Sequence, residues 1–121
     1  RAEDKVTQSP GSLKVVEGEA AVLNCSYSTS DSSPYLFWYV QYSNDFPRYV
    51  LRRLASGYKE NADKFKKRFD ATLDKNTILL TIQKTEISDS ALYYCALRPT
   101  VRIRQSTQYF KTNLKFEVSN V

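Results

Sequence analysis

The sequence contains no histidine and no methionine, and it has only three glycines and two cysteines among its 121 residues. Histidines and CxxC pairs supply most zinc sites, so their absence argues against zinc, and we expect neither a metal ion nor a cofactor. The lack of histidine also removes the commonest catalytic base. Because no pattern positions the remaining serine, aspartate and glutamate side chains for catalysis, we expect a binding protein and not an enzyme.

Long apolar runs are also absent. No segment approaches the roughly 20 apolar residues that a membrane-spanning helix needs. The first residues, RAEDKVTQ, are charged and do not form a signal peptide. We expect a mature ectodomain, or a fragment of one, with no membrane insertion of its own, whereas an anchor beyond Val121 would belong to a longer protein.

Acidic residues are fewer than basic ones, 13 against 18, which gives a formal net charge of +5. Such a surplus is typical of proteins that bind nucleic acids, acidic polysaccharides or membrane surfaces. The basic residues are nevertheless spread along the chain with acids between them, and they are densest at 48–53 and 64–68. Solvated strand edges and loops explain this distribution better, so we expect no nucleic-acid partner.

Aromatic residues are plentiful, with nine tyrosines and six phenylalanines. Strand-like runs recur every 8–12 residues or so with turn residues between them, which is the pattern of a β-sandwich or barrel. We count about nine strands. The first is interrupted at Pro10 and Gly11, where we expect it to switch sheets, and residues 55–62 are expected to form a polar connection.

Alternation along the strands assigns their faces, because successive side chains of a strand point to opposite sides of the sheet. Cys25 falls on a buried face of its strand. In the aromatic strand 35–41, Trp38 and Val40 share one face, and Tyr39 and Gln41 share the other.

Two cysteines and one tryptophan form a recognisable framework. Trp38 follows Cys25 by 13 positions, and Cys95 ends the segment DSALYYC (89–95). These residues resemble the cysteine–tryptophan–cysteine framework and the D-x-A-x-Y-Y-C pattern of immunoglobulin variable domains. The resemblance implies an all-β, variable-type sandwich of about nine antiparallel strands in two sheets joined by one disulfide.

The same resemblance implies roles for individual residues. Cys25 and Cys95 would form the bridge, with the tryptophan packed against it. The tyrosine two positions before the second cysteine would hydrogen-bond back to the backbone, and an arginine–aspartate pair would lie at the base of the domain. The structural residues that it implies are Trp38, Arg68, Asp89 and Tyr93.

Three segments narrow the resemblance further. DKVTQSPGSLKVVEGEAAVLNCSY, LFWYVQ and ISDSALYYCAL are similar to T-cell receptor alpha or delta variable segments. They imply one immunoglobulin V-type domain over 1–121, with a variable segment at 2–97, a third hypervariable loop at 98–107 and a joining-segment-like last strand at 108–121. Alpha and delta chains share some variable segments, so residues 2–97 do not show to which of the two chain types this sequence belongs.

The last strand departs from the family pattern F-G-x-G. Phe110 is followed by Lys111 and Asn113 where the two glycines of that pattern would stand. Those glycines shape a β-bulge that twists the strand toward a partner chain. Without them, either the strand runs straighter or the chain is an unusual or altered receptor.

The side chains that point outward, next to the inward Trp38 and Cys95, predict a pairing surface on this sheet. In similar receptors they pack against a second variable domain, the beta chain for alpha or the gamma chain for delta, and the glutamine bonds to its counterpart. Weak self-association is expected of the isolated domain, and the alternative is an ordinary solvated sheet face. The residues expected at this interface are Tyr39, Gln41, Pro47, Tyr94 and Phe110.

Three loops are expected at one end of the sandwich, at 28–34, 54–58 and 98–107. Loops held by a rigid scaffold commonly carry recognition. The alternative for the third loop is a mobile segment without a fixed ligand. The expected ligand-binding residues are Ser30, Asp31, Ser32, Ser33, Tyr35, Ala55, Ser56, Tyr58, Arg98, Pro99, Thr100, Val101, Arg102, Ile103 and Arg104.

The resemblance implies an antigen-recognition domain of a heterodimeric T-cell receptor. Its ligand would be a peptide or other molecule presented by an MHC or MHC-like protein. The domain itself would lie outside the cell, at the T-cell surface, and the full-length protein would be anchored to the membrane. The alternative is a non-rearranging adhesion or regulatory receptor with a V-type domain, which the missing glycines favour.

One further motif is an N-glycosylation sequon, Asn24-Cys25-Ser26. Its middle residue is the core cysteine and it lies on a strand. We therefore expect the sequon to be unused.

Overall fold

The computed structural model describes residues 5–8, 12–98 and 110–119, and at 8 and 110–115 the backbone only. The described chain is built from short strands and two single turns of 3-10 helix. The strands are Lys5–Gln8 (β1), Ser12–Val16 (β2), Ala21–Ser28 (β3), Tyr35–Gln41 (β4), Arg48–Leu54 (β5), Lys59–Asn61 (β6), Phe69–Asp74 (β7), Thr77–Ile82 (β8), Ala91–Arg98 (β9) and Phe110–Ser119 (β10), and the turns are Asp63–Phe65 (η1) and Ile87–Asp89 (η2).

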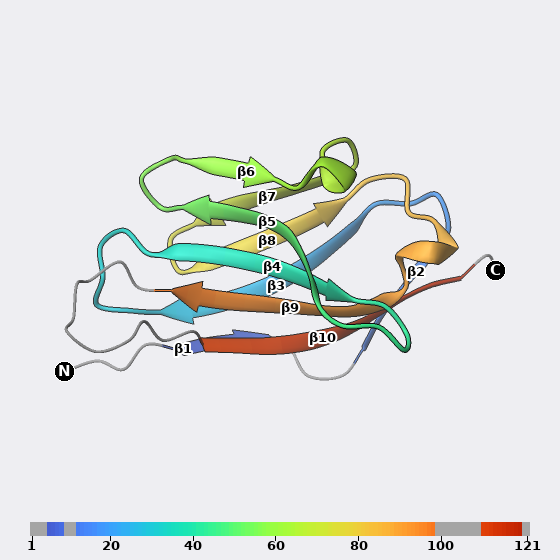
Figure 1. Cartoon of the computed structure of the whole chain (residues 1–121), viewed down its shortest axis with the longest axis horizontal. Coiled ribbons are helices and arrows are strands. Elements are labelled where there is room, and N and C mark those ends of the chain that lie inside the picture. The colour runs from blue at the N-terminus through green and yellow to red at the C-terminus, as the bar shows by residue number, and fades with distance from the viewer. Residues whose placement is uncertain (1–4, 9–11, 99–109, 120–121) are drawn as a thin grey trace.

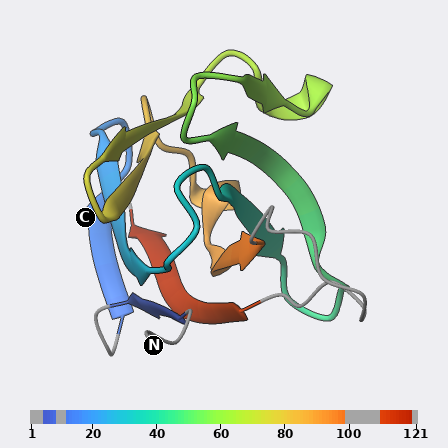
Figure 2. The same ribbon diagram turned by 90° about the vertical axis from the view of Figure 1, so that its left-hand side faces the viewer.

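The strands form two facing sheets (Figures 1 and 2). One sheet has four strands in the order β1-β3-β8-β7, and the other has six in the order β2-β10-β9-β4-β5-β6. This is the all-β sandwich expected from the sequence. Within the described ranges neither helical turn has the length and apolar character that a membrane span requires.

The strand count and directions differ from expectation in two places. The interrupted first strand becomes β1 and β2, which belong to different sheets as expected, and the connection at 55–62 contains the additional short strand β6. Not every pair is antiparallel, because β2 runs parallel to β10 from Ser12↔Lys115 to Val16↔Ser119. These two strands come from opposite ends of the chain, so no hairpin forces them into antiparallel pairing.

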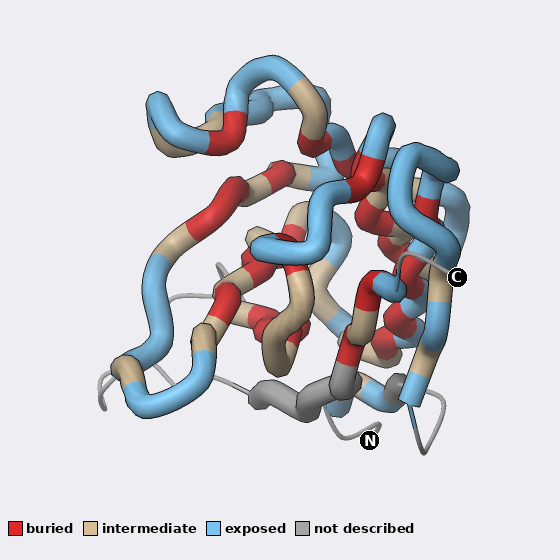
Figure 3. The backbone as a smooth tube through the Cα atoms, turned by 90° about the vertical axis from the view of Figure 1, so that its right-hand side faces the viewer, coloured by how far each residue is buried: buried red, intermediate tan, exposed pale blue. Residues whose placement is uncertain are grey.

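Side chains alternate between the core and the solvent along the strands, and this alternation explains how the two sheets stack. On β3 the residues Ala21, Leu23, Cys25 and Tyr27 are buried, while those between them are exposed. Figure 3 shows the buried stretches along the inside of the sandwich and the exposed ones on its turns. The core thus lies between the two sheets, as the period of two requires.

The Cys25–Cys95 disulfide joins the two sheets, with the two Cα atoms 6.4 Å apart. Trp38 is fully buried in the core and lies directly opposite Cys95 in the β4–β9 pair. Its indole Nε1 has no hydrogen-bond acceptor among the described residues, so packing alone holds the ring. In the chain-entropy account, closing a loop of 70 residues stabilises the fold by about 4 kcal/mol.

The last strand pairs with β9 without a β-bulge. Its pairing with β9 keeps one register from Phe110↔Leu97 to Phe116↔Ala91, whereas the β4–β5 pair shifts register between Trp38 and Tyr39. Positions 111 and 113, where the family glycines would stand, thus pair as ordinary strand residues. The bulge that those glycines shape in the family is therefore absent from this pairing.

Candidate recognition and pairing surfaces

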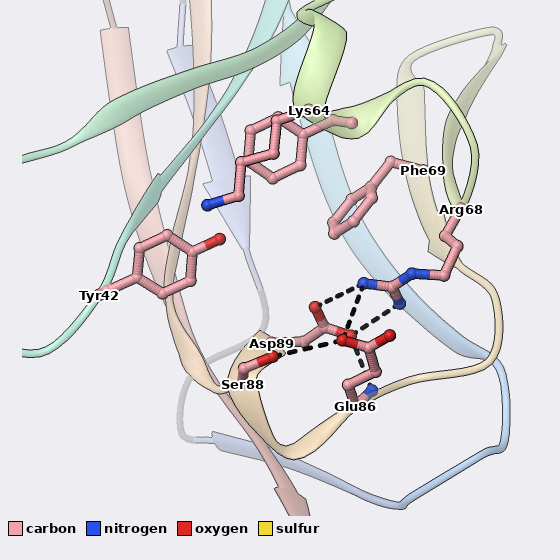
Figure 4. A pocket seen from close by; sticks show the side chains of 8 residues that line it. Tyr42, Lys64, Arg68, Phe69, Glu86, Ser88 and Asp89 are labelled. Atoms are coloured by element: carbon pink, nitrogen blue, oxygen red, sulfur yellow. Dashed lines mark hydrogen bonds and ion pairs between the residues drawn. The ribbon is translucent and has the colours of Figure 1, made fainter.

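A network at the base of the sandwich joins the residue before β7 to η2 and β9 (Figure 4). Arg68 donates from Nη1 to Asp89 Oδ2 at 2.9 Å and from Nη2 to Asp89 Oδ1 at 3.0 Å. The backbone N–H of Glu86 donates to the same carboxylate at 2.8 Å. The Tyr93 hydroxyl donates to the backbone oxygen of Asp89 at 2.8 Å. The pair at the base and the tyrosine contact implied by the sequence are therefore both present.

The electrostatics of this network follow from its geometry. Hydrogen bonds to Asp89 raise the pKa of the Arg68 guanidinium above its ordinary value, although burial opposes them. Burial raises the pKa of the Tyr93 hydroxyl, so the phenol stays protonated and remains a donor. Asp89 itself is buried. Such a carboxylate is stable in the fold only while its partner is in place.

A hollow of about 330 Å³ lies beside the network, between Tyr42, Lys64 and Phe69. Figure 4 shows the Tyr42 hydroxyl and the Lys64 amine turned into it, and the amine lies 5.0 Å from the Tyr42 ring centroid. Burial raises the pKa of Tyr42, which disfavours a reactive phenolate. The charged groups at its floor, Arg68 and Asp89, bond to each other, so the hollow is a structural feature of the base.

The outward face of the six-stranded sheet carries a row of aromatic rings along β4. Tyr35 and Phe37 have centroids 5.9 Å apart, and Phe37 and Tyr39 have centroids 6.2 Å apart. Tyr39 also meets Tyr49 of β5 edge to face at 6.1 Å. Phe37 is buried although it is not part of the core between the sheets. The sequence interpretation omitted Phe37 and Tyr49, and the alternation of β4 would have placed Phe37 beside Tyr39.

Two of the expected interface residues, Gln41 and Tyr94, contact each other on this face. The Tyr94 hydroxyl donates to Gln41 Oε1 at 2.7 Å. Gln41 Nε2 donates to the backbone oxygen of Asp45 at 2.8 Å. Pro47 is exposed in the adjoining turn beside Phe46, which is 64% exposed. Phe110 begins β10, and its side chain lies outside the described residues.

The first two expected loops lie together at one end of the sandwich, where β9 ends and β10 begins (Figures 1 and 2). Within the first loop, Asp31 accepts from the Ser33 backbone N–H at 3.0 Å. The backbone N–H of Ala55 donates to Pro34 O at 3.2 Å and so joins the two loops. Gly57 has a φ of 126°, a conformation that favours glycine, and this allows the tight 54–58 turn.

Arginines stack on the aromatic row near these loops. The Arg98 guanidinium lies 4.7 Å from the Tyr35 ring centroid and 5.8 Å from that of Phe37. Arg52 lies between Tyr35 and Tyr58, at 5.7 and 5.5 Å from their centroids. The remaining expected residues of the third loop, Pro99, Thr100, Val101, Arg102, Ile103 and Arg104, lie outside the described residues.

Comparison with known families matches residues 8–119 to the immunoglobulin V-set domain. The chain belongs to the immunoglobulin V-set family. It is 42% identical over 96 residues to the T-cell receptor alpha chain V region CTL-F3 of Mus musculus, covering 78% of this chain and 69% of that protein. It is 40% identical over 97 residues to human T cell receptor alpha variable 18, covering 78% and 82%.

A further relative of this V-set chain is human T cell receptor alpha variable 36/delta variable 7, which is 38% identical over 98 residues, covering 79% of this chain and 81% of the relative. The chain is therefore similar to T-cell receptor alpha variable regions, and one of these relatives carries both the alpha and the delta designation. Receptor variable regions are a non-enzymatic kind of protein. Among the described residues, no three cysteine, aspartate or glutamate side chains gather where they could hold a metal ion.

One structural residue of the V-set chain was missed by the sequence interpretation. Arg53, grouped with the solvated basic residues, is buried and links β5 to β7. It donates to Asp70 Oδ1 at 2.9 Å and to Ala71 O at 3.2 Å. Partial burial alone would raise the pKa of Asp70, but the hydrogen bonds from Arg53 and from the Ala71 N–H hold it below its ordinary value. The signal was available, because Arg53 stands two positions after the inward Leu51.

The base network generates a stability prediction. Arg68→Ala leaves the buried Asp89 carboxylate without its partner, and we expect the free energy of unfolding to fall by about 3 kcal/mol. Lys66→Ala is the matched control, because Lys66 pairs with Asp63 in solvent at 3.0 Å and should contribute no more than about 0.5 kcal/mol. Denaturant titration of the three proteins measures both values. Equal losses in the two variants would contradict the assignment.

Proposed function

We propose that this chain is the antigen-recognition variable domain of a T-cell receptor alpha chain, or of a delta chain that shares its segment. In this proposal the outward face of β9, β4 and β5 pairs with a second variable domain, and the loop end binds a ligand presented by an MHC or MHC-like protein. The domain would lie outside the cell, at the T-cell surface. The observation that carries the proposal is the aromatic row with Gln41 held at its end.

The state of Gln41 supports pairing. A primary amide has two N–H donors and an oxygen with two acceptor sites. Tyr94 and Asp45 each use one of these, which leaves one donor and one acceptor and fixes the orientation of the amide. An amide held in this way can form a reciprocal pair of hydrogen bonds with an amide of the partner at little entropic cost.

The apolar surface around this amide supports the same conclusion. Phe46 is largely exposed beside Pro47, and the Arg48 guanidinium lies 4.7 Å from its ring centroid. Aromatic and arginine side chains are enriched in protein interfaces. An isolated domain would leave this surface open to weak self-association.

Pairing is tested by Tyr39→Arg, which places a charge in the middle of the aromatic row. Co-expression with a beta or a gamma chain should bring the wild-type chain to the cell surface with one of them. We expect the variant to lose this pairing, because a charge buried in an interface without a partner opposes association. Val22→Arg, on the outward face of the other sheet, is the matched control and should pair normally. Normal surface delivery of the Tyr39 variant would refute pairing through this face.

The loop end supports a ligand that carries an acidic group. Among the described residues Arg98 has no ion-pair partner, and its guanidinium is stacked on two rings. A stacked guanidinium keeps the N–H groups around its edge available for carboxylate or phosphate. Arg102 and Arg104 in the same expected loop would add to this attraction.

The ligand proposal predicts that Arg98→Ala weakens binding of the paired receptor to its presented ligand by about 1–3 kcal/mol if the side chain is desolvated in the complex. The loss should come with a weaker dependence on salt, because a charge interaction has been removed. Lys84→Ala, at the opposite end of the domain, serves as the control. Affinity and salt dependence that match the wild type would show that Arg98 takes no part in binding.

The unbroken register of β10 favours a second candidate, a non-rearranging adhesion or regulatory receptor. A strand without the family bulge would approach a partner chain at a different angle. The coding sequence distinguishes the two candidates. A junction between the codons of Leu97 and Phe110 supports a rearranging receptor, and an uninterrupted exon supports the alternative.

A further inference from the structure

One edge of the sandwich carries a groove whose lining residues belong neither to the proposed pairing face nor to the expected loops. The strands β6 and β7 are the outermost members of their sheets, and they follow each other in the chain around η1 (Figures 1 and 2). A groove of about 450 Å³ lies beside them. Its lining includes four basic residues, Arg53, Lys59, Lys66 and Lys67, but only two acidic ones, Glu60 and Asp70.

The acidic side chains of the groove already have cationic partners. Asp70 accepts a hydrogen bond from the buried Arg53 at 2.9 Å. Glu60 forms an ion pair with Arg52 at 3.1 Å, and it also accepts from the Tyr49 hydroxyl at 2.8 Å. Both carboxylates are therefore bound to groups other than the lysines of the groove.

The lysines of the groove are open to solvent. Lys59 and Lys67 are exposed, and neither forms an ion pair with another described residue. Lys66 pairs with Asp63 at 3.0 Å, but both side chains are mostly exposed, and such a pair is weak enough to open. The groove thus presents three ammonium groups, two of them without a partner among the described residues.

The sequence alone does not reveal this groove, because the dense basic run at 64–68 divides in the fold. Lys64 and Arg68 belong to the hollow at the base of the sandwich. Lys67 instead lines the groove, where Lys59 of β6 joins it. Charges that the sequence pattern assigned to separate solvated edges are therefore gathered at one place.

Hydrogen bonds within the domain hold the walls of the groove. The Arg53 guanidinium donates to Glu60 O of β6 at 3.3 Å and to Ala71 O of β7 at 3.2 Å. The side-chain amide of Asn61 donates to Phe69 O at 2.9 Å. Because these bonds fix both walls without a ligand, a ligand needs to order only the exposed lysine side chains.

We propose that this groove binds a sulfated polysaccharide through its sulfate groups. The proposal goes beyond the proposed function and takes from it only the extracellular location, where such polysaccharides occur. Sulfate groups stay ionised at physiological pH, and the lysine ammonium is a compact charge with three donors on a flexible stem. A linear chain of such groups along the edge of the sandwich would meet the lysines in turn.

The lining favours a polysaccharide over other polyanions. Phe69 is the one aromatic or apolar residue of the described lining, and it is only 5% exposed. Single-stranded nucleic acids stack their bases on accessible aromatic side chains, and membrane-surface segments insert exposed apolar groups beside their lysines. This groove offers neither feature, so charge and polar contacts must account for binding.

The test uses a heparin octasaccharide as the probe and measures its binding to the chain with the oxidised disulfide by calorimetry. We expect binding at low salt that weakens as the salt concentration rises. Lys59→Gln combined with Lys67→Gln should lower the affinity on the order of tenfold, because two exposed charge contacts are lost. Lys59→Arg combined with Lys67→Arg keeps both charges and should bind as the wild type does.

The matched control lies at the opposite edge of the sandwich. Lys5 and Lys14 are exposed on β1 and β2, which are the outermost strands at the other ends of the same two sheets. Lys5→Gln combined with Lys14→Gln removes the same net charge, but it should leave the affinity within about twofold, because distant exposed charges are screened. Equal losses in the two double variants would overturn the proposal, since net charge alone would then attract the polyanion.

Further measurements separate the remaining outcomes. No binding of the octasaccharide at low salt overturns the proposal, and so does tighter binding of a polyglutamate peptide or of anionic lipid vesicles. The glutamine variant of Lys59 and Lys67 should melt at the same temperature as the wild type, because neither lysine has an ion pair to lose. It should also reach the cell surface with the beta or gamma chain, so a failure of octasaccharide binding leaves the proposed function standing.

Discussion

The burial of Trp38 opposite Cys95, in the same core as the Cys25–Cys95 disulfide, is the constraint on which the other surfaces depend. It fixes one inward face on β3, β4 and β9, and alternation then fixes every outward face. The aromatic row of β4 points outward because Trp38 points inward. For the same reason Asn24 is exposed, since its neighbour Cys25 is in the core. The proposed pairing surface and the exposure of Asn24 are thus consequences of one core arrangement.

The two ends of the sandwich differ in how they are held. At the base, Arg68 and Asp89 form two parallel hydrogen bonds, and Tyr93 adds a third contact to the same turn. At the loop end, the described residues are held by arginines stacked on aromatic rings, and the Ala55 N–H joins the first two loops through Pro34 O. A base held by paired charged groups, under more exposed loops, is an arrangement in which loops commonly carry recognition.

The strand pattern predicted the sandwich and alternation predicted the faces of β4, whereas the disulfide and the pair at the base were implied by the resemblance to variable domains. The parallel β2–β10 pair was not predictable, since it joins the two ends of the chain without a hairpin. The bonds of Gln41 to Tyr94 and Asp45 depend on side-chain geometry across two strands and a turn. Arg53 was assigned to the surface because its charge outweighed its inward position in the pattern.

Hydroxyl-radical footprinting of the chain, alone and co-expressed with the proposed beta or gamma partner chain, tests the assignment of faces most directly. The account predicts that oxidation of Tyr39, Phe46 and Tyr94 slows on pairing because the partner covers the outward face of the six-stranded sheet. Oxidation of Val22 and Ile87, on other surfaces, should be unchanged. Protection of Val22 on the four-stranded sheet, with Tyr39 and Phe46 as reactive as in the free chain, would contradict it.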